Sequence, residues 1–339
     1  MLINSIPKPN FLLSKIVDLK DWAYASIVFN HLTKPNIYAF NVMLPCGNVG
    51  GLVHGKIGHC LVFKTVLDGD EYVNHSLIPM YARCGEMGFA RKVFDEMGDR
   101  GLVSWNSMIS GCAQNGASNE AIVLFNEMRE AGPNPDKVTM IEVLSACSTV
   151  GALDLGKWIE THASERGLQH DVHVASALID MYAKCGSLDD AIRVFESMPH
   201  KNEVSWNAMI SALAFHGQAQ EALSLFWRMS KVNDTVHPND ITFIGVLSAC
   251  VHAGLVDEGR QLFESMSLSF GLVPKVEHYS CMVYLCARAG LLYEAWDLIK
   301  KMPGKPDEIV LGSLLGACQR CRNADVGERV IQLFLEQKL

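Results

Sequence analysis

The hydrophobic positions of the chain recur with the spacing of paired amphipathic helices. One apolar stripe, at positions i, i+3, i+4 and i+7, consists of Trp105, Met108, Ile109 and Cys112. A second stripe with the same spacing consists of Ala121, Leu124, Phe125 and Met128. Gly116 separates the two stripes, and Gly132 with two nearby prolines follows the second. Because no segment alternates hydrophobic and polar residues with the period of a strand, the pattern predicts helices alone.

These stripes belong to a longer repeating pattern. The sequence MYARCGEMGFARKVFDEM begins at Met80, and MYAKCGSLDDAIRVFESM begins at Met181, 101 residues later. VSWNSMIS at Val103 returns with the same offset as VSWNAMIS at Val204, and VLSAC returns at an offset of 103. Three different sub-patterns therefore alternate in a fixed order within a super-period of roughly 100 residues.

The super-period divides into units that each hold two helices. The units run over 71–101, 102–136, 137–171, 172–202, 203–239, 240–275 and 276–307. A single helix pair cannot bury both of its apolar stripes, so neighbouring pairs must stack to complete the core. The sequence therefore predicts an all-α fold, namely an α-solenoid of helix-turn-helix repeats.

The composition narrows the class of protein. The chain has 339 residues, of which 49% are hydrophobic and 19% are charged, which argues against a disordered protein. The net charge of −8 argues against a basic coat for non-specific binding of nucleic acid or membrane, although it leaves room for a narrow basic strip. Because no stretch of 18 apolar residues occurs, no membrane span is expected.

The cysteines follow the repeats. The count of 11 is odd, so no disulfide framework is expected, and a reducing compartment is indicated. Cys147, Cys250 and Cys318 occupy one repeat register, and Cys84 and Cys185 occupy another. The recurrence predicts small helix-packing residues rather than metal ligands.

No catalytic or metal motif stands out. Cys318 and Cys321 form the only CxxC, and one such pair without a second pair or nearby histidines is a weak zinc signal. None of the 12 histidines has a glutamate two places on, as the zinc deaminases require. A P-loop, a dinucleotide fingerprint and a nucleophile elbow are also missing from the sequence. The sequence therefore predicts a protein that is not an enzyme and needs no cofactor or metal.

Several segments resemble a known repeat family. VSWNSMISGCAQNG and IDMYAKCGSLDDAIRVFESMPHKN resemble pentatricopeptide repeats, and VTMIEVLSACSTVGALDLGKWIETHA resembles the long variant of that repeat. The alternation of ordinary, long and short units resembles the plant PLS subfamily. EIVLGSLLGACQRCRNADVGERVIQLFLEQKL resembles the first part of the C-terminal E domain of such proteins, and no DYW deaminase domain follows. The resemblance implies that the solenoid is a right-handed superhelix.

The resemblance also gives a domain organisation. It predicts degenerate or partly deleted N-terminal repeats over 1–70, the repeat array over 71–307 and a truncated E-type extension over 308–339. An ordinary repeat opens around Asn41, and the middle of a long repeat follows around His54. About 30 residues of a repeat pair are therefore expected to be missing there.

The resemblance implies binding of single-stranded RNA, with one base recognised per repeat by the fifth and the last residue of the unit. The pairs and the bases they would prefer are Asn106 with Asp136 for uracil, Ser176 with Asn202 for adenine, Asn207 with Asn239 for a pyrimidine, usually cytosine, and Ser280 with Asp307 for guanine. The alternative is that an Asn or Ser near a helix start only satisfies backbone groups.

Other positions complete the expected RNA site. Val103 and Val204, at the second place of their units, are expected to pack against bases. Long units carry Ile141 and Ile244 at the fifth place and are expected to act as spacers, because isoleucine cannot hydrogen-bond a base. The unit with His75 and Gly101 departs from the family code and predicts no base. The expected target, from 5′ to 3′, is U-x-A-Y-x-G, where Y is a pyrimidine.

A cation recurs at the thirteenth place of the short units, as Arg83, Lys184 and Arg288. The resemblance implies that these side chains contact the RNA phosphate backbone. The alternative is a cation that interacts with the dipole at the C-terminus of a helix.

The resemblance implies an RNA-binding protein of the mitochondrion or the chloroplast. Its expected role is to select a site for C-to-U RNA editing, with a deaminase recruited in trans and no membrane partner. Cleavage, splicing or stability control of RNA are the alternatives within RNA biology, and a tetratricopeptide-like protein scaffold without RNA binding is the alternative outside it. The N-terminus shows no transit peptide, because its first arginine is Arg83 and Asp18 and Asp21 come early.

Overall fold

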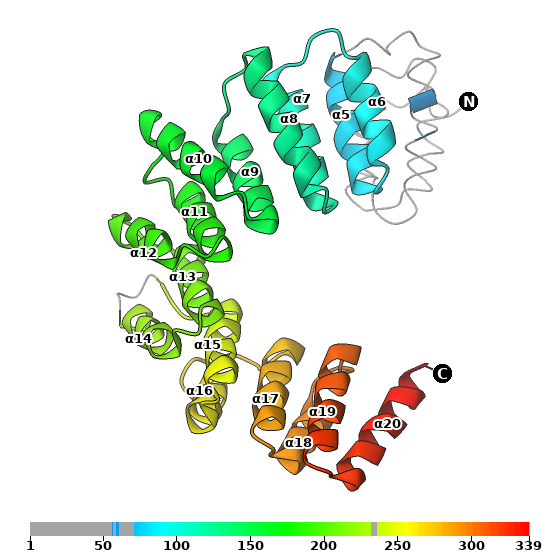
Figure 1. Ribbon diagram of the computed structural model, residues 1–339, viewed down its shortest axis with the longest axis vertical. Coiled ribbons are helices and arrows are strands. Elements are labelled where there is room, and N and C mark those ends of the chain that lie inside the picture. The colour runs from blue at the N-terminus through cyan, green and yellow to red at the C-terminus, as the bar shows by residue number, and fades with distance from the viewer. Residues whose placement is uncertain (1–55, 57–58, 61–70, 232–235, 339) are drawn as a thin grey trace, which may run out of the picture. The chain divides into compact units, whose positions relative to one another are not determined.

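The structure is a computed structural model, and it describes residues 56, 59–60, 71–231 and 236–338. Within these residues the chain forms helices, labelled α5 to α20 in Figure 1, and no strand. The all-α fold predicted from the hydrophobic pattern is therefore confirmed. The predicted segment of degenerate repeats, 1–70, lies outside the described residues apart from 56, 59 and 60.

The helices follow one another in pairs. Their bounds are α5 Glu71–Arg83 and α6 Met87–Glu96, α7 Leu102–Gln114 and α8 Ser118–Ala131, α9 Lys137–Val150 and α10 Leu153–Glu165, α11 Val172–Lys184 and α12 Leu188–Ser197, α13 Glu203–Phe215 and α14 Ala219–Met229, α15 Asp240–Ala253 and α16 Val256–Leu268, α17 Val276–Arg288 and α18 Leu292–Lys301, and α19 Glu308–Arg320 and α20 Ala324–Lys338. From α5 to α18, the first helix of each pair begins at the first residue of a predicted unit.

Polar caps explain why most first helices begin where they do. The residue before the helix accepts, through its side chain, a backbone N–H of the first turn, which otherwise has no partner inside the helix. These caps are Asp136 for α9, Asp171 for α11, Asn202 for α13, Asn239 for α15 and Asp307 for α19. Because each cap is the last residue of its unit, local chemistry fixes the boundary between units.

Two glycines shape the pair of α7 and α8. Gly116 lies in the turn between α7 and α8 with φ of 75°, a left-handed conformation that glycine adopts without steric cost. Gly111, on α7, faces α5 so closely that a Cβ at this position would lie 2.8 Å from the Cβ of Ala82. The absence of a side chain there lets the two helices approach each other.

The two predicted stripes of the 102–136 unit form its core. Trp105 is 2% exposed, and the other seven residues of the stripes are fully buried. Trp105 packs edge to face against Phe94, with ring centroids 4.8 Å apart, and Trp206 packs in the same way against Phe195 at 5.2 Å. The same aromatic pair therefore joins the second helix of one repeat to the first helix of the next.

The chain divides into two compact units, Met1–Leu155 and Gly156–Leu339. In the first unit, the first helices α5, α7 and α9 pack in sequence order. In the second unit, α11, α13, α15, α17 and α19 do the same (Figure 1). Each helix contacts mainly its neighbours along the chain, which is the packing of an α-solenoid.

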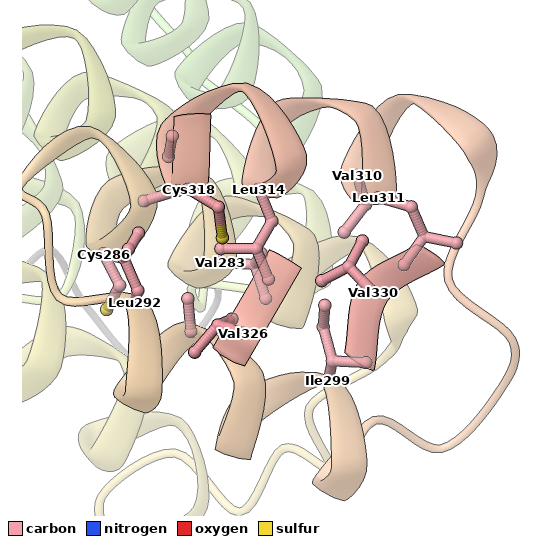
Figure 2. Close-up of a cluster of buried hydrophobic side chains, with 13 residues drawn as sticks. Val283, Cys286, Leu292, Ile299, Val310, Leu311, Leu314, Cys318, Val326 and Val330 are labelled. Carbon is pink, nitrogen blue, oxygen red and sulfur yellow. The ribbon is translucent and has the colours of Figure 1, made fainter. Parts of the chain in front are cut away.

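The segment predicted as an E-type extension forms one more helix pair, α19 and α20. Figure 2 shows its core, in which Leu314 and Cys318 of α19 and Val330 of α20 are buried together. Val283 of α17 and Leu292 of α18 belong to the same cluster. The extension therefore stacks on the last predicted repeat through an apolar interface.

Cysteines were predicted to pack between helices, and no membrane span was expected. Cys147, Cys250 and Cys318 are buried, as their shared register predicted, whereas Cys84 and Cys185 are half-buried at the ends of α5 and α11. Burial raises the pKa of the Cys250 thiol to about 12. Over the described part of the chain, no helix is both long and apolar enough to cross a membrane.

Candidate nucleic-acid interface

The fifth and the last residue of the 102–136 unit lie in direct contact. Asn106 is the fifth residue of α7, and Asp136 immediately precedes α9. Asn106 donates from Nδ2 to Asp136 Oδ1 over 3.1 Å. Thr139, on the first turn of α9, donates from Oγ1 to Asn106 Oδ1 over 2.6 Å. The two residues predicted to recognise one base thus form a hydrogen-bonded cluster with a threonine, which we call an amide cluster.

The helix that Asp136 caps also holds it in place. Its Oδ1 accepts the Thr139 N–H at 2.9 Å, and Thr139 Oγ1 accepts the Asp136 N–H at 3.1 Å, so the two residues form a capping box. Burial by itself would raise the pKa of the Asp136 carboxyl. The hydrogen bonds from Thr139 and Asn106 outweigh burial and hold this pKa below its ordinary value. Asp136 is therefore ionised at neutral pH and offers only acceptors.

The 203–239 unit forms a second amide cluster with the same geometry. Asn207 donates from Nδ2 to Asn239 Oδ1 over 3.1 Å, and Thr242 Oγ1 donates to Asn207 Oδ1 over 2.6 Å. Asn239 Oδ1 also accepts the Thr242 N–H at 3.1 Å, and Asn239 Nδ2 donates to Glu203 Oε2 at 3.1 Å. The two clusters differ in the last residue, because an amide in one replaces the carboxylate in the other.

The short unit 172–202 does not form such a cluster. Ser176 is nearly buried, and its hydroxyl donates to Val172 O at 2.7 Å, one turn back on its own helix. Asn202 caps α13 by accepting the Ser205 N–H at 3.0 Å. Both residues occupy the predicted helix positions, but each one bonds locally.

The short unit 276–307 repeats this local arrangement. Ser280 donates to Val276 O at 2.8 Å, and Asp307 accepts the Val310 N–H at 2.7 Å. Ser280 is half-buried, while Asp307 is exposed. In the short units, the fifth and last residues therefore both bond to backbone groups, which is the kind of bonding that the alternative for a helix-start Asn or Ser describes.

The second-place valines lie on the surface beside the amide clusters. Val103 is 56% exposed and Val204 is 52% exposed, although both are apolar. Each lies three residues before the fifth-place asparagine of its helix, Asn106 or Asn207, and therefore on the same helix face. This placement leaves an aliphatic surface next to the polar groups, as packing against a base requires.

Two kinds of unit depart from this arrangement. Ile141 and Ile244, at the fifth place of the long units, are half-buried and have no side-chain group that could hydrogen-bond. In the first described unit, His75 Nε2 and Ser104 Oγ lie 2.8 Å apart. This contact joins the fifth residue of one unit to the third residue of the next, the same register as the contact between Asn106 and Thr139.

The recurring cations Arg83, Lys184 and Arg288 end the helices α5, α11 and α17, and all three are exposed. Lys184 forms an ion pair with Asp180, one turn earlier, at 2.9 Å. These positions suit both a phosphate contact and an interaction with the helix dipole, so the two explanations stay open.

The capping-box threonines were missed by the sequence reasoning. Thr139 and Thr242 contact both members of the predicted pairs, yet neither occupies a fifth or last place. A signal was present, because each lies three residues after a capping Asp136 or Asn239, which is the spacing of a capping box. That spacing does not reveal that the threonine hydroxyl also contacts the fifth-place asparagine of the preceding repeat.

The CxxC pair does not converge on a common site. Cys318 lies on α19 and is buried in the hydrophobic core, whereas Cys321 lies at the end of that helix and is exposed. Among the residues that the structure describes, no three His, Cys, Asp or Glu side chains lie close enough to hold a metal ion.

Comparison with family models places these observations in context. A model described as the PPR repeat family matches residues 100–149 and 201–252. A model described as the PPR repeat matches 75–102, 174–202, 241–269 and 277–306. Together these matches span more than half of the chain. The chain belongs to the pentatricopeptide repeat (PPR) family. This confirms the repeat family inferred from the sequence motifs.

Curated PPR proteins of Arabidopsis thaliana show the same relationship. One, whose name includes the words chloroplastic/mitochondrial, is 44% identical over 311 residues, which cover 90% of this chain and 49% of the relative. Another is 42% identical over 290 residues, which cover 85% of this chain and 44% of the relative. The chain therefore spans about half the length of these PPR relatives.

A solved PPR structure shows the same fold. The crystal structure of the PPR protein PPR10 in complex with an 18-nt psaJ RNA element matches with a TM-score of 0.80 at 18% identity. The match covers 98% of this chain and 51% of PPR10. The predicted solenoid of helix-turn-helix repeats is thus confirmed as a PPR fold.

Proposed function

We propose that this PPR protein binds single-stranded RNA with sequence specificity and recognises one base per repeat. The observation that carries the proposal is the direct contact between the fifth and the last residue, in Asn106 with Asp136 and in Asn207 with Asn239. Each pair places free donors and acceptors next to an exposed valine, so one base could meet both an aliphatic surface and hydrogen-bonding groups. The solved complex of PPR10 with RNA supports RNA as the ligand class.

The 102–136 unit is suited to uracil. Asn106 uses one N–H and one lone pair inside its amide cluster, which leaves one N–H to donate to uracil O4. Asp136 is ionised and can accept the N3–H of uracil through a carboxylate oxygen. Cytosine would present its N4 donor to the Asn106 N–H and its N3 lone pair to the carboxylate, so both contacts would be repulsive.

The 203–239 unit differs from the first in its last residue, and we propose that it accepts either pyrimidine, with cytosine assigned as the usual one on the family code. Asn239 Oδ1 already accepts from Asn207 and Thr242, and one Nδ2–H already donates to Glu203. The second Nδ2–H remains free to donate to an acceptor such as cytosine N3. Asn239 therefore offers a donor where Asp136 offers an acceptor, which removes the repulsion that Asp136 would exert on cytosine N3 and so weakens the preference for uracil.

The remaining pairs extend the proposed target to U-x-A-Y-x-G. We assign adenine to Ser176 with Asn202 and guanine to Ser280 with Asp307 on the family code. The long units 137–171 and 240–275 act as spacers, because their fifth residues are isoleucines. Arg83, Lys184 and Arg288 would contact phosphates, and three such contacts would give only modest salt dependence on a chain of net charge −8.

We further propose the cellular role that the sequence suggests. The chain would be a PLS-type PPR protein whose 308–339 segment belongs to an E-type domain. It would select sites for C-to-U editing in the mitochondrion or the chloroplast and recruit a deaminase in trans. The Arabidopsis relatives named chloroplastic or chloroplastic/mitochondrial support an organelle.

Fluorescence anisotropy with labelled RNA tests the binding proposal. The purified chain should bind an RNA with the U-x-A-Y-x-G register more tightly than a scrambled RNA of the same composition. Equal affinity for the two RNAs would refute sequence-specific recognition, and no binding to either would favour a protein scaffold. Crosslinking in plant organelle extracts, followed by sequencing of the bound RNA, would then show whether the bound sites include edited cytidines.

A further inference from the structure

We infer that Thr139 and Thr242 are positioning residues that determine specificity. Each threonine fixes the orientation of the fifth-place amide of the preceding repeat and so decides whether a donor or an acceptor faces the base. This inference rests on the proposed RNA binding and concerns residues outside the fifth and last places. It makes recognition by one repeat depend on the first turn of the next repeat.

The geometry is the same in both copies. Thr139 Oγ1 lies 2.6 Å from Asn106 Oδ1, and Thr242 Oγ1 lies 2.6 Å from Asn207 Oδ1. Both threonines are fully buried, so water does not compete for these hydroxyl groups. The two copies belong to different compact units, so the arrangement occurs twice independently.

The capping box gives each hydroxyl a direction. The backbone N–H of Asp136 donates to Thr139 Oγ1, so one lone pair of that oxygen is already used. A hydroxyl has one proton to donate. Two acceptors lie near it, Asn106 Oδ1 at 2.6 Å and Asp136 Oδ1 at 2.9 Å. The amide oxygen is the closer acceptor, and Asp136 Oδ1 already receives two other N–H groups.

A reversed amide would lose its bond to Asp136. Rotation of Asn106 by half a turn would place its oxygen against Asp136 Oδ1, so that two acceptors would face each other. Nδ2 would then face Thr139 Oγ1, which could accept it only by turning its proton to Asp136 Oδ1, an oxygen that already accepts the Thr139 N–H. In the observed orientation the hydroxyl donates to Asn106 Oδ1, so its loss removes one of the two bonds that hold this orientation.

The second cluster depends more strongly on its threonine. Its last residue is Asn239, an amide that could itself rotate, whereas Asp136 has two equivalent oxygens. Thr242 fixes Asn239 through the backbone N–H at 3.1 Å and fixes Asn207 through the hydroxyl at 2.6 Å. One residue thus orients both amides that would face the same base.

A third-place hydroxyl alone does not produce this effect. Ser205 occupies the same register in the unit after Ser176 and is fully buried, but its hydroxyl donates to Asn202 O at 2.9 Å. Ser176 donates back to its own helix. The chain therefore contains a matched control position at which loss of the hydroxyl should leave base choice unchanged.

The first measurement is a four-base RNA panel with the full chain. The base opposite the 102–136 unit is set to U, C, A or G in the U-x-A-Y-x-G background, and affinities are measured by anisotropy. For Thr139→Val, the ratio of affinities between U and C should fall by about three- to tenfold, the effect of losing one hydrogen bond. Choice at the base opposite the 203–239 unit should not change in this variant, and Thr242→Val should show the converse.

Two further variants serve as controls. Thr139→Ser keeps the hydroxyl and should keep the U over C ratio close to that of the wild type. Ser205→Ala removes a buried hydroxyl of the same register and should leave the base preference at every position of the RNA unchanged. If Thr139→Val weakens binding to all four RNAs by one common factor, the threonine is only structural and the inference is wrong. An unchanged ratio in Thr139→Val would also overturn it.

The second measurement needs no RNA. Hydrogen exchange of the Asn106 side-chain amide, followed by NMR in the free protein, should be about three- to tenfold faster in Thr139→Val and unchanged in Thr139→Ser. Unchanged exchange in the valine variant would overturn the inference. If the wild type shows no base preference, the proposed RNA function fails, and this exchange experiment alone decides whether Thr139 fixes the amide.

Discussion

The amide of Asn207 donates to Asn239 Oδ1 over 3.1 Å, although 32 positions separate the two residues along the chain. Asn106 makes the same bond to Asp136 at the same distance. The two pairs therefore offer a base the same geometry with different chemistry, because the last residue is an amide in one and a carboxylate in the other. This difference gives the most direct test of the proposed recognition.

Replacing Asn239 by aspartate should convert the second pair into a copy of the first. We expect Asn239→Asp to raise the preference for U over C opposite the 203–239 unit by about tenfold, since it exchanges a donor for a charged acceptor. Anisotropy with matched U and C oligonucleotides measures this ratio. Glu203 lies next to residue 239, so Asn239→Asp combined with Glu203→Gln controls for repulsion between the two carboxylates. An unchanged ratio in both variants would contradict the pairing of Asn239 with a base.

Removing one of the recurring cations should lower the affinity for all RNA sequences by the same factor. Arg288 is exposed at the end of α17, and a phosphate contact carries no information about the base. Arg288→Ala should therefore weaken matched and scrambled RNA by the same factor and lower the slope of log affinity against log salt by about 0.7. Arg129 lies on α8, a second helix, and Arg129→Ala provides a comparison. An unaltered salt slope in Arg288→Ala would leave the helix dipole as the explanation for this cation.

The carboxylate of Asp136, which caps α9, should make the free energy of unfolding depend on pH in the acid range. The pKa of Asp136 is lowered in the folded protein, so the unfolded chain binds the proton more readily. Its contribution to the free energy of unfolding is therefore complete above the unfolded pKa of about 3.9 and is lost as pH falls through the lower folded value. Urea unfolding at several pH values should show a constant difference between wild type and Asp136→Asn from neutral pH to pH ~5. That difference should shrink in stronger acid, and a difference that changes most near neutral pH would contradict this assignment.

The ion pair between Glu160 and Arg193 should stabilise the second compact unit. The guanidinium of Arg193 donates to both carboxylate oxygens of Glu160 at 2.9 and 3.1 Å, and the hydroxyl of buried Tyr182 donates to Glu160 at 2.5 Å. Glu160→Ala leaves both donors without this acceptor and should lower the free energy of unfolding by about 1–3 kcal/mol. Glu196 forms the comparable pair with Arg228 on a more exposed surface, so Glu196→Ala should cost less than about 1 kcal/mol. Equal losses in urea unfolding would show that the Tyr182 bond contributes little.

Local patterns were sufficient to predict the helices and their grouping. The stripes from Trp105 to Cys112 and from Ala121 to Met128 are buried as their spacing predicted. The unit boundaries coincide with helix starts, because the last residue of most units caps the next helix. Both features depend on interactions within a few residues, so they can be recognised in the sequence.

The site was predicted less completely than the fold. The fifth and last residues of the ordinary units contact each other. In the short units, the fifth residue bonds to its own helix and the last residue caps the next helix. Ser176 and Ser280 have short hydroxyl groups that reach a carbonyl one turn back, whereas the longer amides of Asn106 and Asn207 reach the next repeat. Side-chain length thus separates the two kinds of unit, and the repeat alignment alone does not contain this distinction.

The sequence by itself determined the repeat length, the all-helical fold and the positions that face a common surface, because helix periodicity and capping are local. Only the tertiary structure decided which polar atoms in those positions are already used and which remain free. Thr139 acts on Asn106 from 33 positions away, and packing of α7 against α9 brings them together. The chemistry available to a base is set by hydrogen bonds between repeats, and their partners become neighbours only when the helices stack.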